Sequence, residues 1–165
     1  MNRKRWSIGI CFITITLLYI WSNSLQSTFQ SNEQSNKVLE IIEKVFNIPL
    51  LDMGEAQYVV RKVAHMLEFA LLGFVVVLLL FITGKICRQN LVNALFFGLA
   101  SAVMDETIQL FSHRGSQVVD IWIDFVGLVA GIGLGVSIFL FFREVRIHVH
   151  KRKQAAIYAR HYGDK

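Results

Sequence analysis

The chain has 165 residues, of which 54% are apolar, with one proline, 13 phenylalanines and a formal net charge of +5. This length fits one domain, and four apolar segments approach or exceed the roughly 17–20 residues of a membrane-spanning helix, which excludes an ordinary soluble globular domain. We therefore predict an all-α, polytopic membrane protein with four spans, and we interpret the positive charge first as a topology signal.

Residues 6–22 form the first predicted span. They follow a basic triplet, residues 3–5, so a cleaved signal peptide is the alternative. We favour an uncleaved span because the stretch after it, SNSLQSTFQ, offers no small-x-small cleavage site. Tyr19 and Trp21 also stand at the far end of the run, where aromatic residues mark a membrane interface.

A polar segment, residues 22–57, separates the first span from the second. Five apolar residues recur in it at helical spacing: Val38, Leu39, Ile42, Val45 and Phe46. This pattern predicts a short amphipathic helix that lies in the membrane interface. We expect Ser35 and Asn36 to cap its start and Pro49 to end it.

The remaining spans are predicted at residues 58–83, 91–111 and 118–142, followed by a basic tail, residues 143–165. Most of the 17 Lys and Arg residues fall in the N-terminus, the 84–90 loop and this tail. Because basic residues concentrate on the cytoplasmic side, we predict that both termini are cytoplasmic and that the 22–57 segment and the 112–117 loop face outward.

Ionisable side chains lie in the predicted outer halves of three spans. Most of them are separated by three or four residues, which places them on one helix face. They are Arg61, Lys62, His65 and Glu68 in the second span, Asp105, Glu106 and Gln109 in the third, and Asp120 and Asp124 in the fourth. A lone charge at membrane depth costs roughly 2.5–3.5 kcal/mol or more, so we expect these groups and Arg114 of the adjoining loop to form one network.

This network has two interpretations. It either locks the helices in register, which is a known use of buried polar groups, or forms a ligand or reaction site. Gly127, Gly131 and Gly135 share a face with the fourth-span aspartates and favour close helix packing there.

Metal and nucleic-acid sites are not expected. Cys11 lies in the first apolar run and Cys87 in a short basic loop, a placement that does not suggest a disulfide framework or a metal site, and we expect no cofactor. We interpret His148 and His150 as exposed tail residues, and we leave the importance of His113 open. The basic tail lacks a nucleic-acid motif, so membrane lipids are its expected partners.

The charged motifs resemble those of the VanZ-like family of small bacterial membrane proteins. The second-span motif is Arg61-Lys62-x-x-His65-x-x-Glu68-Phe69-x-x-Leu72, with phenylalanine where tyrosine is common. The second motif is Asp105-Glu106-x-x-Gln109-x-Phe111-x-x-Arg114, followed by Asp120-x-x-x-Asp124-x-x-Gly127, with Asp124 at a position where asparagine is also frequent. The resemblance implies a bacterial cytoplasmic-membrane protein with a role in lowering susceptibility to teicoplanin, a glycopeptide that targets cell-wall precursors.

Three functions stay open. The first is an outward-facing binder of an anionic lipid headgroup, a lipid-linked wall precursor or an acidic glycopeptide, with Arg61, Lys62, His65 and Arg114 as its cations and Glu68, Gln109 and Asp124 beside them. The second is a membrane enzyme on a lipid-linked precursor, with His65, Asp105, Glu106 and Asp120 as acid–base candidates or with carboxylates that hold a divalent cation. The third is ion transport, which the apolar inner halves of the spans disfavour, although a homo-oligomer would offer another path.

Overall fold

A computed structural model describes residues 3–46, 53–112 and 117–162, and Pro49, His113 and Arg114 lie outside these ranges. The described residues form five helices and no strand: α1 (Arg3–Ser24), α2 (Thr28–Phe46), α3 (Met53–Ile82), α4 (Arg88–Phe111) and α5 (Val118–Tyr162). Four of these helices are long and apolar enough to cross a membrane, namely α1, α3, α4 and α5. The predicted all-α membrane fold is therefore confirmed.

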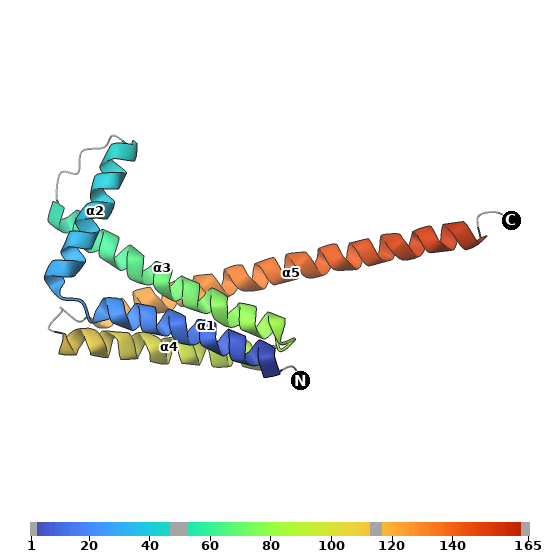
Figure 1. Ribbon diagram of the computed structural model, residues 1–165, viewed down its shortest axis with the longest axis horizontal. Coiled ribbons are helices and arrows are strands. Elements are labelled where there is room, and N and C mark those ends of the chain that lie inside the picture. Colours follow the sequence, from blue (N-terminus) through green and yellow to red (C-terminus); the bar gives the residue numbers. More distant parts are fainter. Residues whose placement is uncertain (1–2, 47–52, 113–116, 163–165) are drawn as a thin grey trace.

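The helices α1, α3, α4 and the first half of α5 pack into one bundle (Figure 1). Its core consists of side chains with almost no exposure: Ile20, Phe69, Leu72, Val77, Ala102 and Leu128. Large apolar residues such as Phe12, Leu71, Phe96 and Val126 are exposed on the outside. An exterior of this kind suits a hydrocarbon surround, in which helices satisfy their own backbone hydrogen bonds.

Glycines bring α3 and α5 into backbone contact. A side-chain carbon at Gly127 would overlap the backbone of Met66, and one at Gly131 would overlap the carbonyl oxygen of Ala70. Gly73 makes the converse contact from α3, against the backbone of Leu128. The glycine row predicted as a packing face is confirmed, because only residues without a side chain allow this approach.

The helix α2 begins earlier than the sequence pattern predicts. It starts at Thr28, so the expectation that Ser35 and Asn36 cap it is wrong. Ser27 is the capping residue: its hydroxyl accepts from the Gln30 backbone N–H at 3.3 Å, while the Gln30 side-chain oxygen accepts from the Ser27 N–H at 3.2 Å. This reciprocal pair is a capping box, a stronger start signal than a lone hydroxyl.

Residues inside α2 attach it to the bundle. The Ser35 hydroxyl donates to the Ser31 carbonyl at 3.0 Å, and the Asn36 side-chain oxygen accepts from the Gln57 amide of α3 at 2.5 Å. Ser31, Ser35 and Leu39 form its buried face, four residues apart, so α2 is amphipathic. The helix therefore crosses one end of the bundle (Figure 1), and its location in a membrane interface remains a prediction.

Basic residues gather at the opposite end. There α3 ends at Ile82, and the turn after it contains Gly84, whose φ of +68° favours glycine. The ammonium of Lys85 lies 4.7 Å from the centre of the Trp6 ring of α1. Beyond this end α5 continues without a break to Tyr162 and projects past the other helices (Figure 1). The predicted tail from residue 143 is thus a continuation of the fourth spanning helix.

Candidate functional site

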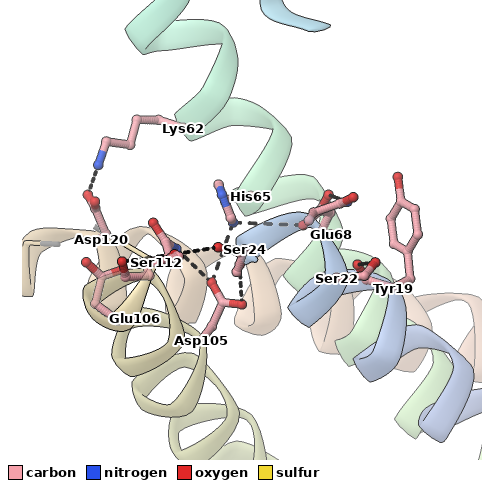
Figure 2. Close-up of polar contacts among 12 residues, drawn as sticks. Tyr19, Ser22, Ser24, Lys62, His65, Glu68, Asp105, Glu106, Ser112 and Asp120 are labelled. Atoms are coloured by element: carbon pink, nitrogen blue, oxygen red, sulfur yellow. Dashed lines mark hydrogen bonds and ion pairs between the residues drawn. The ribbon is translucent and has the colours of Figure 1, made fainter. Parts of the chain in front are cut away.

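The ionisable residues of α3, α4 and α5 meet at the end of the bundle that α2 crosses. In α3, Lys62 and His65 lie in the first half and Glu68 lies at the middle. Asp105 and Glu106 lie near the end of α4, and Asp120 and Asp124 lie near the start of α5. Figure 2 shows that the labelled side chains from these helices point toward one another. The structure thus brings together the residues that the sequence placed at one level.

Asp105 is at the centre of the cluster and has no exposed surface. Its Oδ1 accepts from the Ser24 hydroxyl at 2.6 Å, and its Oδ2 accepts from the Gln109 amide at 2.9 Å. His65 Nδ1 lies 3.7 Å from the same Oδ2. Hydrogen bonds to a charged group are stronger than neutral ones, so these donors stabilise a carboxylate out of water.

Glu68 and His65 form the side of the cluster that faces α1. Glu68 Oε1 accepts from the Asn23 amide at 2.6 Å, and Glu68 Oε2 lies 3.8 Å from His65 Nδ1. The imidazole is therefore placed between the carboxylates of Glu68 and Asp105 (Figure 2). A positively charged imidazole in this position would be attracted to both carboxylates.

Two other carboxylates have separate partners. Asp120 forms an ion pair with Lys62, and both side chains are largely buried, at 11% and 14% exposure. Glu106 Oε1 accepts from the Gln117 backbone N–H at 2.5 Å, just before α5 begins. The N-terminus of a helix carries partial positive charge, so this position favours the Glu106 carboxylate.

Asp124 differs from the other carboxylates. It is buried, at 1% exposure, and no hydrogen bond or ion pair from another described residue reaches its carboxylate, whereas Glu106, which also has one unbonded buried oxygen, accepts a hydrogen bond at the other. An unsatisfied buried polar atom costs free energy and in a native structure needs an explanation.

Two hollows adjoin the cluster. A cavity of about 140 Å³ is lined by Arg61, Lys62, His65, Gln109, Asp120 and Asp124, together with Thr28 and Ile123. A larger groove of about 390 Å³ runs between α1, α2 and α3 and contains many amide and hydroxyl side chains. Arg61 and His65 line both, so they form the wall between cavity and groove.

The sequence prediction missed the contribution of α1 and α2. Asn23 and Ser24 bond two of the carboxylates, the Ser112 hydroxyl donates to the Ser24 carbonyl at 3.0 Å, and Thr28 lines the cavity. The signal in the sequence is the run of polar residues directly after the first apolar segment. Arg114, the remaining predicted site residue, lies outside the described ranges.

Replacing Ser24 by alanine should lower the free energy of unfolding by about 2 kcal/mol, since it removes a hydrogen bond to a buried carboxylate. Thermal unfolding of the purified protein in detergent would measure the loss. Ser22→Ala is the matched control, because the Ser22 hydroxyl is exposed and donates to the Tyr19 carbonyl of its own helix. Equal stability of the two variants would contradict a structural role for the Ser24 bond.

Comparison with known proteins gives one positive result. The sequence profile of the VanZ/LLP1 family matches residues 8–142. This range includes all of α3 and α4, most of α1, the first part of α5 and the described part of the charged cluster. Neither the curated proteins nor the solved structures contain a match. Because the profile covers more than half of the sequence, this chain is a member of the VanZ/LLP1 family.

Proposed function

We propose that the protein binds an anionic envelope ligand, the phosphate-bearing headgroup of a lipid or lipid-linked wall precursor, at the outer face of the bacterial cytoplasmic membrane. Binding of this ligand by the protein would lower the susceptibility of the cell to teicoplanin-like glycopeptides, which act on wall precursors. The observation that carries the proposal is a guanidinium, Arg61, on the wall of a partly enclosed cavity.

The distribution of charge supports the outward orientation. The basic N-terminus, the Lys85 turn and the α5 extension lie together at one end, and the cluster lies toward the other (Figure 1). Basic segments are retained on the cytoplasmic side, so the cluster would face outward. An outward site can be reached by a lipid-linked precursor and by a glycopeptide.

Arg61 is available for a ligand. Among the described residues its guanidinium makes no ion pair, and it lies 5.8 Å from the centre of the Tyr58 ring. The adjacent Lys62 already pairs with Asp120. A planar guanidinium can bind two oxygens of one phosphate or carboxylate, which gives both affinity and orientation.

The groove beyond Arg61 supports a headgroup larger than a phosphate. Asn23, Gln26, Gln34, Ser31 and Ser35 line it, beside the apolar Val38, Val60 and Ala64. Amides and hydroxyls both donate and accept hydrogen bonds, which matches the hydroxyl groups of a sugar. A phosphate at Arg61 would thus place an attached sugar in the groove.

Arg61→Ala should weaken binding of a lipid-linked sugar phosphate by about tenfold or more, because a hydrogen bond between charged groups is worth roughly 1.5–3 kcal/mol. Titration of the protein in nanodiscs with a fluorescent lipid-linked precursor would measure this, alongside the teicoplanin susceptibility of cells. Arg88→Ala, at the exposed opposite end, is the control and should bind normally. Normal binding by a well-folded Arg61→Ala protein would end the proposal.

A second function, acid–base catalysis on the precursor, is favoured by the position of His65 between two carboxylates. Mass spectrometry of lipid-linked precursors distinguishes it from binding. An enzyme would convert the precursor to a product of different mass when incubated with purified protein, and would stop doing so in His65→Gln. An unchanged precursor pool would rule out catalysis and leave binding as the proposed function.

A further inference from the structure

The partners of the clustered carboxylates leave one of them unexplained. Glu106 faces the start of α5, Asp120 faces Lys62, Glu68 faces Asn23, and Asp105 faces Ser24. Asp124 is almost completely buried, and no hydrogen bond or ion pair from another described residue reaches either oxygen of its carboxylate. At the described part of the site, five carboxylates also face only two permanently charged cations, Arg61 and Lys62. Both observations point to a missing positive charge beside Asp124.

Three donor groups surround the place where that charge would lie. His65, Asp105 and Asp124 each offer one ligand atom, and these atoms all lie within 4.8 Å of one another. The three residues come from three helices, α3, α4 and α5, and each is buried or nearly so. Packing of the bundle, rather than a flexible loop, therefore holds the donors close together.

We propose that His65, Asp105 and Asp124 bind a divalent transition-metal ion of the Zn²⁺ or Mn²⁺ class. An imidazole nitrogen suits these ions better than Ca²⁺ or Mg²⁺, which prefer oxygen ligands alone, and two carboxylates balance the charge. From the sequence we expected no resident metal, although a divalent cation held by carboxylates was one alternative for an enzyme. The first and last of the three donors, His65 and Asp124, are separated by 59 positions in the sequence, so only the fold shows that the donors lie together.

Neighbouring groups complete the arrangement. Ser24 and Gln109 hold the Asp105 carboxylate from both sides, and such outer contacts orient metal ligands and raise affinity. His65 and Asp124 also line the 140 Å³ cavity, so an ion held there would keep a coordination position open to it. This inference goes beyond the proposed headgroup binding, because an ion can bind whether or not a phosphate later joins it.

Equilibrium dialysis of the full chain, purified in detergent without a polyhistidine tag and stripped with chelator, tests the site. Dialysis against Zn²⁺ and separately Mn²⁺, followed by elemental analysis, should find about one tightly bound ion per chain. Asp124→Asn and His65→Gln should each weaken binding by at least about tenfold, the effect seen even for outer contacts. A double variant, His148→Ala with His150→Ala, controls for the exposed histidines of α5 and should bind like the original chain.

Each outcome of this experiment decides for or against the metal site. No ion above the level of empty detergent micelles, or binding lost only in the α5 double variant, would overturn the site. So would unchanged binding in Asp124→Asn, which keeps the shape of the side chain and should fold if His65→Gln does not. The headgroup titration with Arg61→Ala is a separate test. If the chain binds no metal but its headgroup binding depends on Arg61, only the metal site is refuted. If the chain binds metal as expected but headgroup binding does not depend on Arg61, only the proposed function is refuted.

Discussion

Gly131→Leu is expected to lower the free energy of unfolding by more than about 3 kcal/mol and to prevent much of the protein from accumulating in the membrane. The first side-chain carbon would overlap the carbonyl oxygen of Ala70, which is backbone and cannot rotate away. The larger leucine can be accommodated only if α3 and α5 separate along their shared face. Separation would also pull Asp124 of α5 away from His65 of α3, so ligand binding should fall together with stability.

Gly133→Leu is the matched control for this substitution. Gly133 is two residues away in the same helix, and a carbon added there meets nothing within 4 Å. Leucine is also the better helix former, so stability should be unchanged or slightly higher. Detergent thermal unfolding and size-exclusion elution of both proteins would decide. Equal loss in both variants would show that the glycines serve helix flexibility rather than close packing.

Lys62→Met is expected to cost about 3–5 kcal/mol of unfolding free energy, because it leaves the Asp120 carboxylate buried without its counter-charge. Methionine keeps much of the aliphatic length of lysine, so the effect isolates the charge. Denaturant unfolding in mixed micelles would measure the loss. A loss of unfolding free energy below about 1 kcal/mol would mean that the pair behaves like an ion pair on a water-exposed surface.

Two further variants separate the charge from the packing. Lys62→Met combined with Asp120→Leu removes both charges, and a buried ion pair replaced by apolar residues is often neutral, so most of the stability should return. Lys37→Met removes the partner of Glu33 in α2, where the two side chains are 69% and 57% exposed. That pair should contribute at most about 1 kcal/mol. Destabilisation of the double variant as large as that of Lys62→Met would attribute the effect to shape.

The spanning helices and their packing faces were predicted well from the sequence. The four apolar runs predicted four helices able to span a membrane, because a continuous apolar helix of that length has few other stable surroundings. The spacing of Gly127 and Gly131 predicted a packing face, and the motifs from Arg61 to Gly127 indicated the family that the profile match confirms. These features depend on one helix at a time, where residues four apart always share a face.

The start of α2 and the site residues at the end of α1 were predicted less well. The apolar residues from Val38 onward drew attention to the second half of α2, although Ser27 and Gln30 form a capping box before them, at the true start of the helix. The polar residues Asn23 and Ser24 also escaped notice as site residues, because nothing in the sequence shows that the end of α1 reaches Glu68 and Asp105.

The sequence by itself determined the number of spanning helices and the faces on which their charges lie, since both follow from helical periodicity and from the cost of a charge in an apolar surround. Only the tertiary structure decided which charge meets which partner. Lys62 pairs with Asp120, and Glu106 meets the start of α5. Asp124 lies beside His65 and Asp105, with no hydrogen bond or ion pair from any residue that the structure describes. These contacts depend on the relative rotation and depth of separate helices, which packing against glycines and the core fixes and which no single-helix pattern contains.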